Sequence, residues 1–226
     1  MWWKRLLNRV VRTTVLERLQ LVSFSMPGWV EEAHTKGMRV WRAPDGDVLS
    51  LAMLDESTAP LPRFSDETAI RRWSRSIAEN AQAGLIEVRA ISGSRESSAS
   101  LIYKRLAMPA YIFTGVLFLR RQAATEVWTA VSGEKGTTGT REAAVTAELF
   151  NSGRFSRRGD YEQVWARDPY DADYRGVDGN VLRFISDDEC YDEEFPDHPL
   201  SKVRSLLLAI PISSWVGSLS ARAGDF

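Results

Sequence analysis

Two strand-like runs joined by a short turn constrain the fold more than any other feature of this sequence. The runs MRVWRAP (38–44) and DVLSLAML (47–54) are rich in apolar, aromatic and β-branched residues. The turn sequence Pro44-Asp45-Gly46-Asp47 separates them, and Asp-Gly between two such runs is a strong signal for a hairpin. We therefore expect an antiparallel sheet that includes residues 38–54.

Further strand-like runs extend this sheet, and helices occur in blocks between them. The runs are LVSFSMPGW (21–29), which stops at Pro27-Gly28, then GLIEVRAIS (84–92), SLIYKRLA (100–107), AYIFTGVLFLRR (110–121), TEVWTAVS (125–132), YEQVWARD (161–168) and VLRFIS (181–186). Consecutive strands with short turns and separate helical blocks are typical of an α+β fold. We expect an antiparallel β-sheet covered by helices.

Three internal helices are predicted from capping residues and apolar spacing. The first begins at Ser65, a capping residue, and ends near Gly84, which can adopt a left-handed conformation. The second covers about Thr140 to Asn151, with the Thr140 hydroxyl as its cap. The third covers about Leu200 to Ala209 and ends before Pro211, because proline interrupts helical hydrogen bonding.

The composition favours an intracellular globular protein. Of the 226 residues, 44% are hydrophobic and 26% are charged, and Cys190 is the single cysteine. One cysteine excludes an intramolecular disulfide and fits a reducing compartment. The basic start of the chain has charged residues within its apolar stretch, which is not typical of a signal peptide. We predict a cytoplasmic protein.

The first 20 residues are predicted to form an amphipathic helix with cations beside tryptophans. The residues proposed for contact are Trp2, Trp3, Lys4, Arg5, Arg9 and Arg12. Such a helix suits an anionic membrane surface or the groove of a partner protein. The alternative is a helix that packs on its own sheet and directs its arginines toward the acidic region of the chain.

Acidic residues are concentrated in the second half of the chain. Residues 160–197 contain 13 acidic and 3 basic side chains, although the net charge of the whole chain is −1. This distribution disfavours nucleic acid as a partner. The segment also lacks the ligand spacing and central glycine of a calcium loop. We therefore predict an acidic surface that meets a partner, formed by Asp187, Asp188, Glu189, Asp192, Glu193 and Glu194.

No set of residues in the sequence predicts catalysis, a metal or a cofactor. The only histidines are His34 and His198, and Cys190 lies among carboxylates that suppress its thiolate. Three glycines in VSGEKGTTGTRE (131–142) could form a phosphate-binding turn, but the sequence matches no known phosphate-loop pattern. A turn that leads into a helix is the favoured interpretation. A hydrolase or transferase that uses Cys190, His198 or this loop remains a weaker alternative.

The order of elements resembles the PsbP-like fold. The residues that carry the resemblance are FSMPGW, MRVWRAP and DVLSLAML, then a helix and several strands, and finally EVWTAVSGEKGTTGTRE running into a helix. This fold is shared by photosystem PsbP subunits, a Ran-binding nuclear import factor and bacterial relatives that include Eag-type secretion chaperones. The resemblance covers 21–153 and carries no functional residue across. It implies a non-enzymatic binding role.

These observations predict one α+β domain over 21–226, after the helix of 1–20. Its core is 21–153, and 154–226 is a C-terminal extension. We expect a non-enzymatic cytoplasmic protein that binds another protein, as an adaptor, an effector chaperone or an immunity-like partner. The alternative is a peripheral membrane protein that is anchored by the N-terminal helix.

Overall fold

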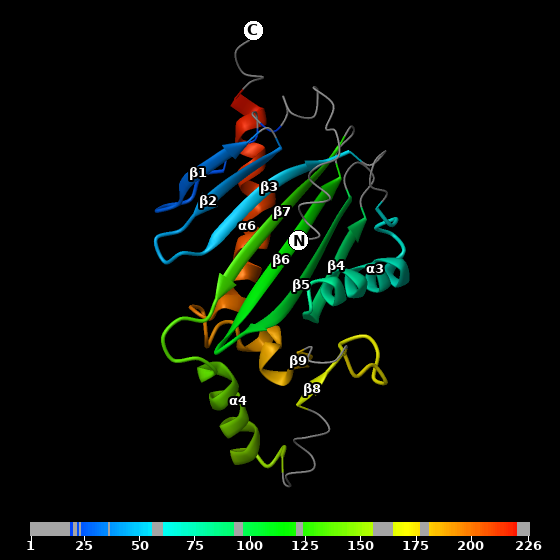
Figure 1. Ribbon diagram of the computed structural model, residues 1–226, viewed down its shortest axis with the longest axis vertical. Coiled ribbons are helices and arrows are strands. Elements are labelled where there is room, and N and C mark those ends of the chain that lie inside the picture. The colour runs from blue at the N-terminus through cyan, green and yellow to red at the C-terminus, as the bar shows by residue number, and fades with distance from the viewer. Residues whose placement is uncertain are drawn as a thin grey trace.

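A computed structural model describes residues 19, 22, 24–35, 37–55, 61–92, 97–120, 124–155, 165–176 and 181–220, with backbone only for 34, 91, 92 and 211–220. Its main sheet has seven strands: β1 (Val30–Thr35), β2 (Met38–Arg42), β3 (Val48–Leu54), β4 (Gly84–Ser92), β5 (Ser97–Ala107), β6 (Ala110–Arg120) and β7 (Thr125–Gly133). The helices are α3 (Glu67–Asn80), α4 (Thr140–Asn151) and α6 (Pro199–Ser220). Figure 1 shows this arrangement.

The sheet consists of two antiparallel meanders placed side by side. The strand order is β1-β2-β3-β7-β6-β5-β4, and every neighbouring pair is antiparallel. The predicted hairpin is confirmed, because Arg42 pairs with Val48 across a turn in which Gly46 has a φ of 89°. Glycine adopts that conformation without the steric cost that other residues incur.

The first strand lies later in the chain than predicted. Residues 24–29 are not in a strand, and β1 begins at Val30, after the Pro27-Gly28 turn. Phe24 instead packs its ring against Trp41, with centroids 5.3 Å apart, and Trp41 stacks on Trp128 at 5.7 Å. The apolar residues that suggested a strand there are explained by this aromatic cluster, since burial needs no particular secondary structure.

Helix α3 has the predicted apolar face but different ends. Its cap is Asp66 rather than Ser65, and the Asp66 side chain accepts a hydrogen bond from Ala69 N at 2.9 Å. The left-handed residue after the helix is Gln82, with a φ of 52°, whereas Gly84 is the first residue of β4. A carboxylate and a hydroxyl group can both cap a helix, so the sequence alone does not show whether Ser65 or Asp66 is the cap.

The two faces of the sheet are covered by different helices. One face packs against α3 through a cluster that includes Ile70, Ile77 and Phe118. The opposite face packs against α6 through a cluster that includes Trp128 and Leu207. In Figure 1 the two helices lie on opposite sides of the strands. The predicted α+β class with an antiparallel sheet covered by helices is confirmed.

A glycine in β6 sets how closely α6 approaches the sheet. A Cβ on Gly115 would lie 2.5 Å from Cγ1 of Val203 and 2.8 Å from Cδ1 of Leu207. Both distances are shorter than a van der Waals contact between carbons. The absence of a side chain at Gly115 therefore lets α6 lie directly on the middle of the sheet.

Helix α6 continues past the residue at which it was predicted to end. The backbone is helical from Pro199 to Ser220, through Pro211. Proline removes one hydrogen bond and crowds the preceding turn, but a helix can continue beyond it with a bend. The prediction that Pro211 ends this helix is wrong.

Helix α4 packs against the last quarter of the chain. Val145 and Leu149 share a cluster with Phe155, Trp165 and Tyr191. A two-stranded sheet of β8 (Ala166–Arg167) and β9 (Arg183–Phe184) lies beside it, followed by two short 3₁₀ helices, η1 (Ile185–Asp187) and η2 (Glu189–Tyr191). Residues on both sides of the predicted division at 153 therefore pack together.

Candidate functional site

A network of buried charges lies where α4, α6 and the 3₁₀ helices meet one end of the sheet. The Lys104 ammonium on β5 pairs with the Asp187 carboxylate on η1, and both side chains are fully buried. Burial lowers the pKa of Lys104, while the Asp187 charge opposes that shift. Lys104 also lies over the Phe184 ring, 3.2 Å from its centroid.

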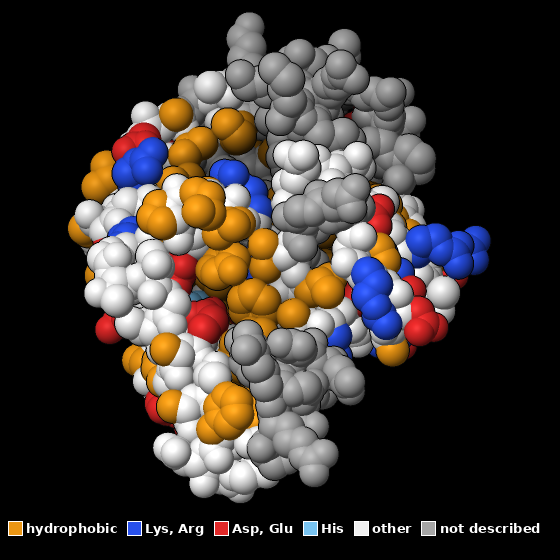
Figure 2. All heavy atoms as spheres, turned by 60° about the horizontal axis from the view of Figure 1, so that its bottom comes forward, with side chains coloured by type: hydrophobic (Ala, Val, Ile, Leu, Met, Phe, Trp, Pro, Cys, Tyr) orange, Lys and Arg blue, Asp and Glu red, His pale blue; other side chains and the backbone are white. Residues whose placement is uncertain are grey.

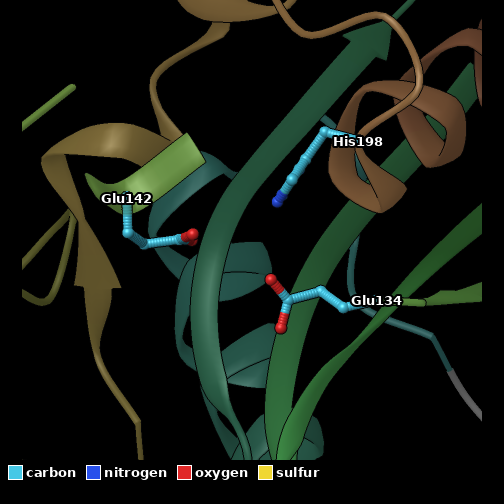
Figure 3. Close-up of side chains that lie close together, drawn as sticks. All are labelled: Glu134, Glu142 and His198. Carbon is cyan, nitrogen blue, oxygen red and sulfur yellow. The ribbon is translucent and has the colours of Figure 1, made fainter. Parts of the chain in front are cut away.

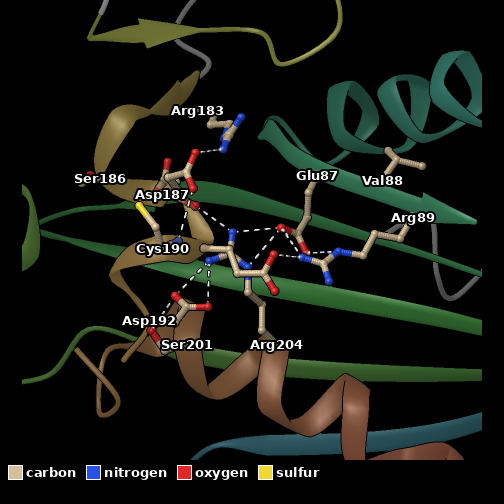
Figure 4. Close-up of polar contacts among 12 residues, drawn as sticks. Glu87, Val88, Arg89, Arg183, Ser186, Asp187, Cys190, Asp192, Ser201 and Arg204 are labelled. Carbon is tan, nitrogen blue, oxygen red and sulfur yellow. Dashed lines mark hydrogen bonds and ion pairs between the residues drawn. The ribbon is translucent and has the colours of Figure 1, made fainter. Parts of the chain in front are cut away.

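Two buried arginines connect the acidic segment to the helices. Arg141 on α4 donates to the backbone carbonyl of Ser186 at 2.6 Å and to the Asp192 carboxylate at 3.0 Å. Arg204 on α6 donates to Asp192 at 2.9 Å and to Glu87 on β4 at 2.9 Å. Figure 4 shows Arg204 between these two carboxylates. Charge-assisted hydrogen bonds of this kind fix orientation as well as distance.

The structure places the six residues of the predicted acidic surface in three different environments. Asp187 is fully buried, and Asp192 holds two arginines, so neither belongs to an exposed acidic surface. Asp188 and Glu189 form surface ion pairs with Arg183 at 3.1 Å and Arg89 at 2.6 Å. Glu193 and Glu194 are exposed. Sequence could not separate these cases, because it does not show which carboxylates meet a buried cation.

The buried cations were missed by the sequence prediction, although Lys104 carried a signal. Lys104 lies two residues after Ile102 in β5, so both point to the face that α6 covers. A charged residue in phase with buried apolar ones indicates a buried partner of opposite charge. Arg141 and Arg204 had no such signal, because both lie on helices near other charged residues.

A second group of polar side chains lies beside this network. Glu134 follows β7, Glu142 is in the first turn of α4, and His198 precedes α6. One side-chain ligand atom from each lies within 4.8 Å of the other two. Figure 3 shows the three side chains directed toward one point from three separate segments.

His198 is held by the start of α6. Its Nδ1 accepts a hydrogen bond from Leu200 N at 3.3 Å, which makes His198 a helix cap, with Pro199 as the first helical residue. Its Nε2 is buried without a hydrogen-bond partner in the described part of the chain. Burial, and then the charge of Arg141, lower the pKa of His198 to about 4.

The two glutamates differ in their surroundings. Glu134 accepts hydrogen bonds from Tyr111 N and Gly139 N, each at 2.8 Å. Neither carboxylate oxygen of Glu142 has a hydrogen-bond partner among the described residues, and burial raises the pKa of Glu142. Glu134 is thus fixed by two backbone donors, whereas the cost of burying the Glu142 carboxylate is only partly offset by the charge of Lys104.

The glycine-rich turn before α4 does not resemble a vacant phosphate site. The Gly139 N–H, which such a site would offer to an anion, donates to the Glu134 carboxylate. Gly139 rather than Thr140 is the cap of α4, with a φ of 72° and no side-chain cap. The favoured interpretation of a turn leading into a helix is consistent with this geometry, but the predicted Thr140 cap is wrong.

The nucleophilic alternative gains no support from the geometry. In the residues with described side chains, no hydroxyl or thiol hydrogen-bonds to His198. Cys190 is an exposed residue. Partial desolvation of its thiol, and then the negative charge of Asp188, raise the pKa of the thiol. A thiol in that environment is mostly protonated near neutral pH and is a poor nucleophile.

An apolar cavity of 480 Å³ opens on the other side of the segment that precedes α6. Its walls come from the 26–29 loop, the β2–β3 turn, residues 196–197 and α6. Met26, Trp29, Pro44, Pro196 and Leu206 supply most of the apolar surface. A cavity of this size accommodates one large side chain or a small ligand.

Charged groups surround this cavity unevenly. Lys202 pairs with Asp45 at 2.7 Å, which lowers the pKa of Asp45 to about 2. Lys135 pairs with Asp47 at 3.0 Å. Asp197 lines the cavity, is exposed, and has no ion pair within the described residues. Three acidic residues, Asp45, Asp47 and Asp197, therefore line the cavity together with one cation, Lys202, and the lining carries a net negative charge.

The N-terminal residues proposed for contact, Trp2, Trp3, Lys4, Arg5, Arg9 and Arg12, lie outside the described residues. Their role at a partner or an anionic membrane stays a prediction. None of the helices in the described ranges has the length and apolar character needed to cross a bilayer.

The described residues define an α+β protein with a helix on each face of an antiparallel sheet. No family model matches the chain, and no curated protein matches it. Among solved structures, it is similar to the Ran-binding protein Mog1p of Saccharomyces cerevisiae, with 10% identity over 55% of this chain and 75% of that one, and a TM-score of 0.37. That likeness is too distant to support an inference about function.

Proposed function

We propose that this chain is a non-enzymatic, cytoplasmic protein-binding protein that takes an apolar side chain of its partner into the 480 Å³ cavity between Trp29 and Leu206. The cavity is the single observation that carries the proposal. Partner anchors in protein interfaces are large apolar or aromatic side chains that fill such cavities.

The charge at the rim selects the chemistry of the partner segment. Asp197 lines the cavity, and Glu193 and Glu194 precede it in the chain; all three are exposed and form no ion pair among the described residues, although the Lys202 charge acts on Asp197 at longer range. A lysine or arginine next to the apolar anchor would meet these carboxylates, which favours encounter and fixes orientation. The expected partner segment therefore joins a large apolar residue to one or more basic residues.

Among the described residues, a second apolar pocket beside β5 and α6 is smaller, at 180 Å³, and other apolar surface is exposed at the end of the sheet. Met108 and Leu106 are exposed near the β5–β6 turn, at 80% and 42%. Figure 2 shows hydrophobic side chains gathered on the face at that end of the molecule, with acidic side chains among them. Apolar atoms make up much of any protein surface, so this face carries the proposal less well than a cavity that can enclose a side chain.

Selection of peptides from a random displayed library on the full chain tests the proposal. Ser205 lines the cavity and is exposed, so Ser205→Trp should fill the cavity without disturbing the core. Ser76→Trp, on the exposed face of α3, is the matched control. We expect enriched peptides to contain a large apolar residue beside Lys or Arg, and to bind the control but not Ser205→Trp.

Peptides that bind Ser205→Trp as tightly as the unmodified chain would exclude the cavity as the binding site. Enrichment of acidic or uncharged peptides would contradict the role of Asp197 at the rim. Addition of 0.5 M salt separates the two contributions, since it screens the carboxylates but leaves apolar burial in place.

A further inference from the structure

We propose that Glu134, Glu142 and His198 bind one divalent transition-metal ion of the zinc type. The three side chains come from segments far apart in the chain, and their ligand atoms lie within 4.8 Å of one another. Figure 3 shows that they converge on one point. This site does not depend on the proposed partner cavity, which lies on other residues.

The first argument is that three polar atoms at this point lack partners. They are Oε1 and Oε2 of Glu142 and Nε2 of His198, all buried and without hydrogen bonds in the described structure. His198 is only 8% exposed. Buried polar atoms are nearly always satisfied, so several such atoms around one point indicate an absent ligand. One metal ion would coordinate both side chains.

The second argument is charge balance. In the neighbouring network, three buried cations meet three carboxylates: Lys104 with Asp187, Arg141 with Asp192, and Arg204 with Glu87. None of these three cations forms an ion pair with Glu134 or Glu142, although the charge of Lys104 acts on both at longer range. A water molecule could satisfy hydrogen bonds but would leave both carboxylates without a cation in direct contact among the described residues. A divalent cation offsets both charges.

The third argument is that Glu134 is already positioned. The hydrogen bonds from Tyr111 N and Gly139 N fix both of its carboxylate oxygens. Each carboxylate oxygen has two acceptor positions, so one position on each remains for a metal. Outer hydrogen bonds that orient a ligand are a general feature of metal sites.

One contact opposes metal binding and limits its strength. Because Nδ1 of His198 accepts the Leu200 N–H at 3.3 Å, the neutral imidazole carries its proton on Nε2. Coordination through Nε2 requires that proton to move or leave. A single protein hydrogen bond is worth about tenfold in an equilibrium constant, whereas micromolar binding represents about a millionfold. We expect Zn²⁺ to bind with micromolar affinity, which is large enough to offset the loss of this hydrogen bond.

The chemical types of the three ligands indicate which metal ion would bind. One imidazole nitrogen and two carboxylates suit zinc and its neighbours, whereas calcium takes six to eight oxygen ligands. A cavity of 340 Å³ adjoins Glu134 and His198 and offers room for a water at a fourth position. Three protein ligands with one open position is the arrangement that zinc adopts in open sites.

Calorimetric titration of the chelator-treated full chain with ZnCl₂, CaCl₂ or MgCl₂ tests the proposal. We expect one equivalent of Zn²⁺ to bind with micromolar affinity, and no comparable binding of the other two ions. Glu142→Gln and His198→Asn should each weaken Zn²⁺ binding by more than about 10- to 100-fold, the loss that follows removal of a residue that only orients a ligand. Asn retains an acceptor for Leu200 N, so the helix cap survives.

Glu148→Gln is the matched control, because Glu148 is exposed on the same helix and lies outside the cluster. It should bind Zn²⁺ like the unmodified chain. Replacement by Co²⁺ gives a second readout, since low-coordinate Co²⁺ with nitrogen and oxygen ligands has visible absorption that both cluster variants should abolish. Absence of Zn²⁺ binding, or equal binding by Glu142→Gln, would overturn the assignment.

Discussion

Lys104 is a charged residue on an otherwise apolar face of the sheet. Its effect on the free energy of unfolding depends on its ion pair with Asp187. Both side chains are fully buried. Lys104→Met would leave the Asp187 carboxylate buried without its cation, which costs about 3–5 kcal/mol. Urea unfolding at pH 7 measures this loss directly.

The matched double variant separates the ion pair from simple packing. Asp187 also accepts a hydrogen bond from Phe184 N at 2.7 Å, which an asparagine can retain. We expect Lys104→Met with Asp187→Asn to be more stable than the sum of the two single losses predicts. Additive losses would show that the two side chains do not interact across the network.

His198 should make stability depend on pH in a defined window. Its pKa is lowered to about 4 in the folded protein from an ordinary value of 6.5. The unfolded chain therefore gains a proton as the pH falls through 6.5, while the folded protein does not until about 4. Stability is full above pH 6.5 and falls by about 3 kcal/mol down to pH 4.

A comparison with His198→Asn isolates this effect, because other groups titrate in the same range. The Glu134 and Glu142 carboxylates lie within 4.8 Å of the His198 imidazole. Arg141 and Lys104 lower its pKa, and Asp187 and Asp192 raise it. Denaturant unfolding from pH 7.5 to 4, with chelator present, should show a steeper loss for the unmodified chain. Parallel curves for the two proteins would exclude a buried neutral His198.

At the scale of elements, α6 and β6 are matched through the missing side chain of Gly115. A Cβ there would lie 2.5 Å from Val203 and 2.8 Å from Leu207, so Gly115→Ala must displace α6. We expect a loss of about 1–3 kcal/mol in thermal or urea unfolding, as is usual for overpacked cores.

Gly133→Ala is the control for this substitution. A Cβ at Gly133 would meet nothing closer than 3.6 Å, so the methyl group fits. This variant should unfold within a few tenths of a kcal/mol of the unmodified chain. If both variants lose the same stability, the close approach of α6 is not the cause.

The predicted N-terminal helix can be tested without shortening the chain. Leu19 is 1% exposed in the core cluster that faces α6, so a chain that begins at Val22 would also lose a core side chain. Full-length Trp2→Ala/Trp3→Ala avoids this. If the helix binds anionic membranes, the double variant should float with liposomes much less than the unmodified chain. Equal flotation would contradict the membrane alternative.

Local signals predicted the elements well and their contacts poorly. The Asp45-Gly46 turn and the spacing of Ile70 and Ile77 depend on neighbours in sequence, and both are reproduced. The convergence of Glu134 with His198, and of Arg141 with Asp192, depends on how distant segments pack. The spacing of apolar residues along the chain does not show contacts between segments that are far apart in sequence. Pro211 is a different case. Proline locally favours the end of a helix, but α6 continues through it to Ser220.

At the scale of the whole molecule, the C-terminal helix and the central strands should unfold together. Leu200, Val203 and Leu207 belong to the same core cluster as Phe113 and Trp128 of the sheet. In hydrogen exchange, amides of 199–210 should therefore be protected to the same free energy as those of β6 and β7. Exchange of α6 well before the strands would show that the region after 153 is a separate unit.

The position of α6 in chain order has a consequence for synthesis. All seven strands of the main sheet precede it, yet the middle of one face, where Val203 and Leu207 lie against Gly115, lacks this helix until residues 199–210 are present. At ordinary translation rates, the interval between the end of β7 and residue 210 is about 4 to 15 seconds. During that interval the apolar surface that α6 covers in the finished protein lacks that helix. Expression yield should therefore depend on chaperone supply more than the stability of the finished protein would suggest.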